Sequence, residues 1–295
     1  MKILMLVHHP DVAHYMWRAF TELGHHVAFA TEKLTLDMGF KYSSMKGEDN
    51  KFEVVDQLFE PSKLYPDMSE IYLHNNIENI SEYEIIWSML PEITSLSKYG
   101  INTWFDGQMQ VYLREKRFAA LPGIKSANHP NAWELNQFHF VPNWVDKQPD
   151  LIEKKYITQM ITECDLVSTT KELKALRDQG YPVKIHGGKK CPDGFIRDIN
   201  ILPYTSMLVH DKQFGVNCYA VCKALDMGIP VYMSKQTRDM IGFGDLPDDC
   251  FLFAHEHTIM EAFELSKLMN NADIQRTYRA IYTLDRTKKA IQTII

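Results

Sequence analysis

The 295-residue sequence has no long apolar runs, which bears directly on membrane insertion. Its longest apolar stretches, such as Ile3–Val7 and Ile85–Leu90, are far below the roughly 20 residues that a membrane-spanning helix needs. No charged-then-apolar leader precedes the first strand-like segment. We therefore expect a cytoplasmic protein with no signal peptide, no transmembrane anchor and no membrane partner.

Cysteine pairs and nucleotide-binding loops are also missing. The five cysteines are odd in number and contain no CxxC pair, so reduced thiols in a cytosol are the simplest interpretation. The loop after the first apolar segment, His8-His9-Pro10-Asp11, contains no GxGxxG through which a pyrophosphate could approach the backbone, and no Walker A loop is present. The sequence thus argues against a nicotinamide-dependent dehydrogenase.

Basic residues are in the minority overall, with a net charge of −6, so no general basic field attracts a polyanion. The imbalance is local, because residues 32–92 hold 5 bases and 13 acids whereas residues 98–190 hold 14 bases and 10 acids. Within the basic segment, Arg114, Lys116 and Arg117 could hold a phosphate-bearing molecule, although a solvated helix face would also explain them. The average charge is therefore a poor guide to a nucleic-acid partner.

Strand-like and helix-like patterns alternate along the first half of the chain. Continuous apolar runs, typical of buried parallel strands, predict strands at 2–7, 26–30, 52–56, 84–87 and 101–105, with helices at 11–23 and 91–99. Gly24 is expected to end the first helix. The alternation predicts an open α/β domain.

A second alternating series follows a hinge at 140–146, where Pro142 and Asn143 interrupt the pattern. Helices are expected at 150–162, 171–179, 218–227, 258–270 and 272–295, and strands at 165–168, 182–186, 206–210 and 229–234. Two α/β domains in one chain suggest a ligand at the carboxyl ends of the strands.

An ordered string of motifs in the second half resembles the sugar-nucleotide site of GT-B glycosyltransferases. It consists of Phe214-Gly215, a helix over 220–227, Gly228-Ile229-Pro230-Val231 and Ser234. In that family a Gly-rich loop enters a helix whose N-terminus faces the donor. The hinge segment 141–146 is similar to the "V-P-N-G-V-D" segment near the interdomain linker of the same superfamily.

The resemblance implies an α/β fold of two Rossmann-like domains facing across a cleft. It implies an acceptor domain over 1–143, a nucleotide-sugar domain over 144–273, and a C-terminal helix over 274–295 that packs back on the first domain. Two departures leave ribose recognition open: Lys223 stands where the family usually has a ribose-binding glutamate, and Lys212 and Gln213 replace a second glutamate. No metal site and no DxD motif of the GT-A class is present, so no metal or other cofactor is expected.

Segments 101–117 and 248–264 resemble the phage enzymes that glucosylate hydroxymethylcytosine in DNA, which are GT-B proteins. This resemblance implies a nucleoside diphosphate sugar, a UDP-sugar, as donor and double-stranded DNA as acceptor. It further implies a monomer that works in the host cytoplasm. A modified base would have to leave the stack to reach the cleft.

Asp106 and His9 are the catalytic candidates. Asp106 follows an apolar strand and precedes Gly107, so its carboxylate suits orientation or deprotonation of an acceptor hydroxyl, although a turn aspartate explains this pair of residues as well. His8 and His9 follow the first strand and could contact the acceptor or the sugar, or could be ordinary loop histidines. The candidates for binding the acceptor are His8, Arg114 and Arg117.

The donor-binding candidates lie in loops and one helix of the second half. A strand ends at His186-Gly187-Gly188-Lys189, where amides and a cation could meet a diphosphate, although a plain glycine turn is the alternative. The remaining donor candidates are Lys171, Phe214, Gly215, Val216, Asn217 and Lys223.

These motifs predict a glycosyltransferase that moves a sugar from a UDP-sugar to a hydroxyl, with hydroxymethylated cytosine of phage DNA as the preferred acceptor. One alternative keeps the enzyme and makes a surface glycan or small metabolite the acceptor. Another is a non-catalytic sugar-nucleotide-binding module, since the two glutamates are missing. If the resemblance fails, a flavodoxin-like or epimerase-like fold remains.

Overall fold

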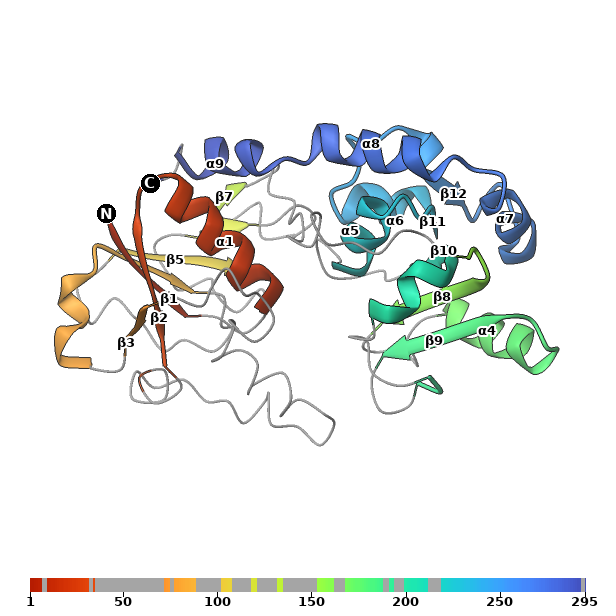
Figure 1. The fold of residues 1–295 in the computed structure, drawn as a ribbon, viewed down its shortest axis with the longest axis horizontal. Coiled ribbons are helices and arrows are strands. Elements are labelled where there is room, and N and C mark those ends of the chain that lie inside the picture. The colour runs from red at the N-terminus through yellow and green to blue at the C-terminus, as the bar shows by residue number, and fades with distance from the viewer. Residues whose placement is uncertain are drawn as a thin grey trace. The chain divides into compact units, whose positions relative to one another are not determined.

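The computed structural model describes residues 1–6, 10–31, 34, 72–74, 77–88, 102–107, 118–120, 132–134, 153–161, 168–187, 191–193, 199–211, 219–292 and 295. The chain divides into two compact units (Figure 1): unit 1 comprises Met1–Phe138 with Leu284–Ile295, and unit 2 comprises His139–Thr283. Each unit is built around one sheet of parallel strands.

The sheet of unit 1 has the order β3-β2-β1-β4-β5-β6-β7. Its strands are β1 (Lys2–Leu6), β2 (His26–Ala30), β3 (Tyr72–His74), β4 (Ile85–Ser88), β5 (Asn102–Gly107), β6 (Phe118–Ala120) and β7 (Ala132–Glu134). The helices are α1 (Pro10–Glu22), the short 3-10 helix η4 (Ile77–Glu82) and α9 (Leu284–Gln292). Strand β1 lies between β2 and β4, and the side chains of residues 3–6 are fully buried because both faces of the sheet are covered there.

Helices α1 and α9 join the two ends of the chain within unit 1 (Figure 1). The hydroxyls of Tyr15 on α1 and Thr287 on α9 lie 2.6 Å apart, and both side chains are buried. An ion pair of 2.9 Å between Lys288 and Glu22 adds to this contact. After α1 the chain turns at Gly24, whose φ of +81° is readily adopted only by glycine.

The sheet of unit 2 has the order β12-β11-β10-β8-β9. Its strands are β8 (Tyr156–Ile161), β9 (Val183–Gly187), β10 (Thr205–Val209), β11 (Val231–Met233) and β12 (Phe251–Phe253). Its helices are α4 (Ser168–Asp178), η10 (Ile199–Tyr204), α5 (Tyr219–Asp226), α6 (Lys235–Met240), η11 (Asp248–Cys250), α7 (Ile259–Ser266) and α8 (Asn271–Ile281).

Side chains alternate between two apolar layers along these strands. Met160, Leu208 and Met233 belong to a core cluster that includes residues of α5 and α8, and we call this side the α5 face. Ile185 and Val209 belong to a second cluster that includes residues of α4 and α7, and we call this side the α4 face. Both faces of the sheet are therefore covered by helices, as a parallel sheet requires.

Helices α5 and α8 are joined by contacts at the turn after α5. Gly228 has a φ of +75°, and a Cβ atom there would lie 2.1 Å from the backbone oxygen of Asn271. The Asn271 side chain donates a hydrogen bond of 2.5 Å to the Gly228 carbonyl. The fully buried carboxylate of Asp226 accepts a 2.8 Å hydrogen bond from Nε of Arg279.

The structure overturns the expected helix at 150–162, because residues 156–161 form β8 in the interior of the sheet. The expected strand at 165–168 ends at a residue, Ser168, that begins α4, and residues 165–167 lie outside the described residues. The expected helix at 272–295 is two helices, α8 and α9. The strand expected at 52–56 and the helix expected at 91–99 also lie outside the described residues.

The expectation of reduced thiols is wrong at Cys191. Cys222 and Cys250 are free and buried, but Cys191 is in a disulfide whose partner lies outside the described residues. The expected lack of a membrane-spanning helix agrees with the described part of the chain, where no helix combines the length and the apolar character needed to cross a bilayer.

Candidate functional site

The carboxyl edge of the sheet in unit 2 is the candidate site, because ligands of open α/β sheets bind where parallel strands end. His186 and Gly187 end β9, and His210 follows β10 directly. Both imidazoles are buried, with 3% and 1% of their surface exposed. Ser234 follows β11 at the same edge.

The two histidines lie on the same face and at the same level of the sheet. Gln159 of β8 pairs with Val209 on one side and Ile185 on the other, so the next row contains His210, Met160 and His186. Because Ile185 and Val209 pack into the α4 face, the following residues point to the α5 face. Two strand spacings, about 10 Å, separate His186 from His210.

Three carboxylates gather near this edge on the α4 face. Burial, followed by the negative charges of Glu172, Asp211 and Glu261, raises the pKa of the Tyr232 hydroxyl to about 12. These carboxylates come from α4, the end of β10 and α7. An anionic group at the carboxyl edge is therefore better accommodated beside the histidines of the α5 face than on the α4 face.

The start of α4, which carries Lys171, is anchored to the sheet by a buried glutamine. Gln159 accepts a 2.7 Å hydrogen bond from the Thr170 hydroxyl and donates one of 3.3 Å to Thr169. Lys171 lies on the first turn of this helix and is exposed. Thr169 and Thr170 thus fix the helix that presents Lys171.

Gly228 of the Gly-Ile-Pro-Val motif and Ser234, which follows the motif, have structural roles in this protein. Gly228 allows α5 to approach α8. The Ser234 hydroxyl accepts a 3.0 Å hydrogen bond from the Thr237 amide and donates one of 2.8 Å to the Thr237 hydroxyl, so it caps α6. Lys223, at the position of the family's glutamate, lies half-buried in the last turn of α5.

The strand that contains Asp106, β5, ends at residue 107, two residues beyond its expected end at 105. Asp106 lies inside β5, opposite Ala119 of β6, rather than after the strand, and is the last residue but one of β5. It therefore remains at the carboxyl end of a strand. The candidates outside the described residues are His8, His9, Arg114, Arg117, Gly188, Lys189, Phe214, Gly215, Val216 and Asn217.

The sequence interpretation did not single out His210. The available signal was the apolar end of a predicted strand, residues 207–209, followed directly by a histidine at the edge where ligands bind. In the part of the chain that the structure describes, no three His, Cys, Asp or Glu side chains form a group that could hold a metal ion.

Comparison with known proteins shows the fold class. No family model and no curated protein matches the sequence. The structure is similar to that of AviGT4, a glycosyltransferase involved in avilamycin A biosynthesis, with a TM-score of 0.51 and 9% identity over 100% of this chain and 96% of that one. The glycosyltransferase SnogD from Streptomyces nogalater gives a TM-score of 0.45 and 12% identity, over 100% of this chain and 99% of that one.

The likeness to AviGT4 extends over both units and confirms the expected fold class, α/β with two Rossmann-like domains of the GT-B type. At 9% identity it bears on the fold alone.

Proposed function

We propose that the protein is a GT-B glycosyltransferase that takes a sugar from a nucleoside diphosphate sugar, a UDP-sugar, and attaches it to a hydroxyl group. The observation that carries the proposal is the likeness of the whole chain to a glycosyltransferase fold. The buried His186 and His210 support it, because they place polar donors at the edge of the sheet where an anionic ligand would bind.

In the proposed reaction the bond between the sugar and the diphosphate breaks, and a new bond forms to the acceptor oxygen. Ring N–H groups of His186 and His210 donate hydrogen bonds to the departing diphosphate, together with backbone amides near Gly187 and Gly215. Asp106 orients the acceptor hydroxyl and takes its proton. Lys171 and Lys189 add positive charge on the donor side.

The proposed acceptor is the hydroxymethylated cytosine of double-stranded DNA. It rests on the resemblance of segments 101–117 and 248–264 to phage DNA glucosyltransferases and on the local excess of bases between residues 98 and 190. The other members of the proposed acceptor site are His8, His9, Arg114 and Arg117. Their positive or hydrogen-bonding side chains suit a phosphate backbone.

Transfer of labelled glucose from UDP-glucose to duplex DNA containing hydroxymethylcytosine tests the proposal. The wild-type protein should label this DNA and leave unmodified DNA unlabelled. Asp106→Asn should lower the rate by about 100-fold, the usual size of a general-base contribution. Asp178→Asn, which changes an exposed aspartate of α4, is the matched control and should keep the rate.

Other outcomes separate the alternatives. Release of UDP without labelled DNA would reject the DNA acceptor and favour a glycan or small metabolite. Binding of a nucleotide sugar without any release of UDP would reject the enzyme and favour the binding module. Absence of both binding and turnover with every nucleotide sugar would reject the proposal.

A further inference from the structure

Strand β12 forms one edge of the sheet in unit 2, and two of its backbone groups have no hydrogen-bond partner among the described residues. Met233 lies opposite Phe253, and the Ala254 amide donates a 3.1 Å hydrogen bond to the Met233 carbonyl. Because backbone groups of alternate residues point to the same side of a parallel strand, Leu252 bonds to β11 whereas Phe251 and Phe253 direct theirs outward.

Half of these outward groups have partners within the chain. The Phe251 amide donates to the Asp248 carbonyl, and the Phe253 carbonyl accepts from the Glu256 and His257 amides at 3.0 and 3.1 Å. No described residue donates to the Phe251 carbonyl or accepts from the Phe253 amide. One acceptor and one donor, two residues apart, thus remain open for a further strand.

The opposite edge of the same sheet is blocked. Asp193 accepts a 2.8 Å hydrogen bond from the Ile185 amide of β9 and donates its own amide to the Ile185 carbonyl at 3.1 Å. Arg177 and Lys184 hold this aspartate with ion pairs of 2.9 and 3.6 Å. A polar side chain that occupies an edge in this way prevents pairing with another strand. Among the described residues, no side chain bonds to the Phe251 carbonyl or the Phe253 amide of β12.

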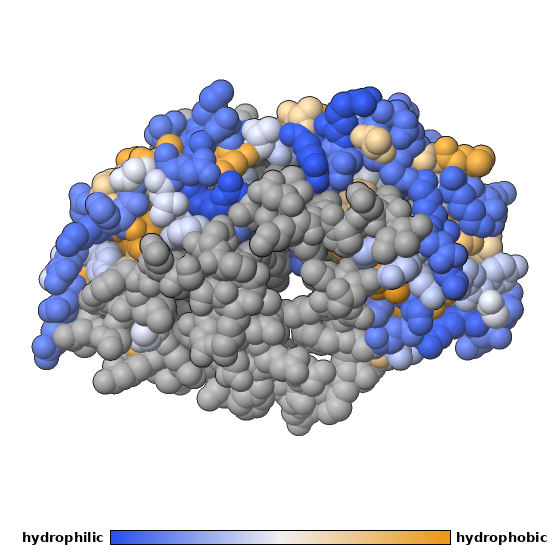
Figure 2. All heavy atoms as spheres, viewed as in Figure 1, coloured by the Kyte–Doolittle hydropathy of each residue, from blue (hydrophilic) through white to orange (hydrophobic). Residues whose placement is uncertain are grey.

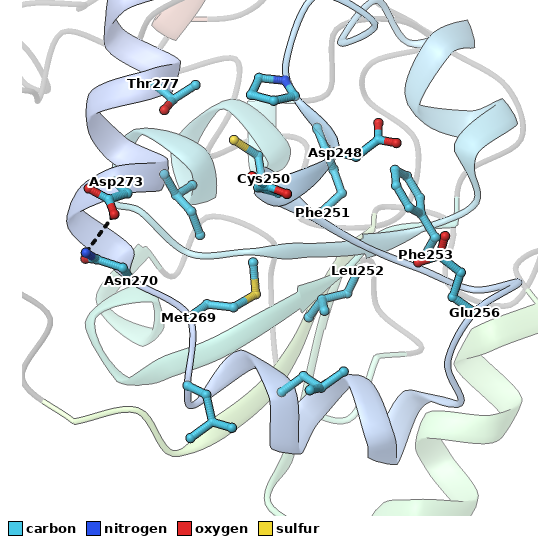
Figure 3. A pocket seen from close by; sticks show the side chains of 15 residues that line it. Asp248, Cys250, Phe251, Leu252, Phe253, Glu256, Met269, Asn270, Asp273 and Thr277 are labelled. Atoms are coloured by element: carbon cyan, nitrogen blue, oxygen red, sulfur yellow. Dashed lines mark hydrogen bonds between the residues drawn. The ribbon is translucent and has the colours of Figure 1, made fainter.

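A groove of about 590 Å³ runs along β12, and all the residues that line it are described. Figure 3 shows Phe251, Leu252 and Phe253 along its middle, with Met269 from the α7–α8 connection and Asp273 and Thr277 from α8 beside them. Leu268 in the same connection is 83% exposed, and Leu265 is 38% exposed. Figure 2 shows apolar residues on the surface at the upper right of the view, where Figure 1 draws α7 and β12.

The groove is acidic. Asp248, Asp249, Glu256 and Asp273 line it, whereas no lysine or arginine does. Asp248 is paired with Arg238 and Lys235, and Asp273 with Arg276. Asp249 makes no ion pair with a described residue, and the neighbours of Glu256 are the histidines at 255 and 257. Asp249 and Glu256 thus leave negative charge available to a partner.

We propose that the β12 groove binds an extended, basic segment of a partner protein, which adds a strand to the sheet. The segment would pair its backbone with the Phe251 carbonyl and the Phe253 amide, and place apolar side chains against Leu268 and Met269. Its lysines or arginines would face Asp249 and Glu256. A second copy of this chain is the poorer occupant, because it would bring two acidic grooves together.

The probe is a fluorescent heptapeptide that alternates lysine with valine, added to the full-length chain and followed by anisotropy. It should bind, and its hydrogen-exchange footprint should include slower exchange of the Phe253 amide. Asp249→Lys should weaken binding by about tenfold, because an attraction becomes a repulsion at one contact. Asp178→Lys makes the same charge change at an exposed site of α4 and should leave binding unchanged.

Three results would overturn the proposal. The first is an absence of binding at millimolar peptide. The second is equal binding of a peptide that alternates glutamate with valine, or of one with N-methylated backbone amides, since the former lacks the charge and the latter the donors. The third is a concentration-dependent dimer of the chain alone that Leu268→Asp abolishes, which would make a second copy the occupant of the groove.

Discussion

At the scale of the residue, two separate features of the structure require glycine at position 228. Its φ of +75° strains any other residue, and a Cβ would collide with the Asn271 backbone at 2.1 Å. Gly180 has a φ of +89° with no atom within 4 Å of its Cβ position, so only the first of these features applies to it. The pair therefore isolates the contribution of the contact between α5 and α8.

Gly228→Ala should lower the free energy of unfolding by about 3 kcal/mol or more, because backbone strain adds to a collision with main-chain atoms. Gly180→Ala should cost about 1 kcal/mol from strain alone. Urea unfolding followed by circular dichroism gives both values. Equal losses in the two variants would mean that α8 moves away from Gly228 without cost.

The residue scale also shows where the sequence interpretation failed. The sequence predicts a helix over 150–162 because apolar residues recur there at helical spacing. In the structure, residues 156–161 form β8 instead. Thr158 and Gln159 are fully buried in this strand, and their hydroxyl and amide groups bond to Thr205 at 2.8 Å and Thr170 at 2.7 Å. Such partners come from other elements, so the local pattern cannot reveal them.

At the scale of the element, α7 begins with a reciprocal cap. The Thr258 hydroxyl accepts a 3.3 Å hydrogen bond from the Glu261 amide, and the Glu261 carboxylate accepts one of 2.8 Å from the Thr258 amide. The backbone hydrogen bond from Thr258 is the main reason that the pKa of Glu261 lies below its usual value of 4.5. The charged carboxylate is therefore the form that stabilises the helix.

Thr258→Ala should lower the free energy of unfolding by about 1 kcal/mol at neutral pH, whereas Thr258→Ser should retain it, because serine keeps the hydroxyl. Since the folded-state pKa of Glu261 is depressed, its stabilising effect is complete above the unfolded-state pKa and is lost as the pH falls through the folded-state pKa. The Thr258 hydroxyl also donates a 2.9 Å hydrogen bond to the Glu261 carboxylate, and only the part of the difference between wild type and Thr258→Ala that depends on this bond should be lost as Glu261 is protonated. The part that comes from the bond between the Glu261 amide and the hydroxyl should remain at acid pH. Equal stability of wild type and Thr258→Ala in urea unfolding at every pH would contradict the cap.

The predictions that the structure confirms are those of elements whose formation depends on a local sequence feature. The continuous apolar runs of β1 and β2 and the glycine at 24 are local features, and the structure confirms the strands and the turn that they predict. The candidate site was harder to predict, because the burial of His186 and His210 depends on the packing of α5 against the sheet rather than on their neighbours in sequence.

At the scale of the whole molecule, the last helix belongs to the unit formed by the first residues of the chain. Thr287 and Ile291 of α9 are fully buried, and Thr287 contacts Tyr15 of α1. Because burial of such side chains contributes to stability, the end of the chain should stabilise unit 1 specifically.

Deletion of residues 284–295 should destabilise unit 1 by about 3 kcal/mol through loss of apolar burial, and hydrogen exchange of β1 and β2 amides should accelerate. Exchange of β10 and β11 amides in unit 2 should be unchanged. Lys288→Ala removes the ion pairs with Glu22 and Asp285 but no buried apolar side chain, and should cost less than about 1 kcal/mol. Equal acceleration in both sheets would contradict the assignment of α9 to unit 1.

The central claim is that a nucleoside diphosphate sugar binds at the carboxyl edge of the sheet in unit 2, on the α5 face. Isothermal titration of the full-length chain with a panel of UDP-sugars tests it most directly. The account predicts binding of at least one UDP-sugar, loss of that binding in the double variant His186→Ala/His210→Ala, and its retention in Glu172→Ala on the α4 face. No binding of any UDP-sugar, or equal binding by the double variant, would contradict it.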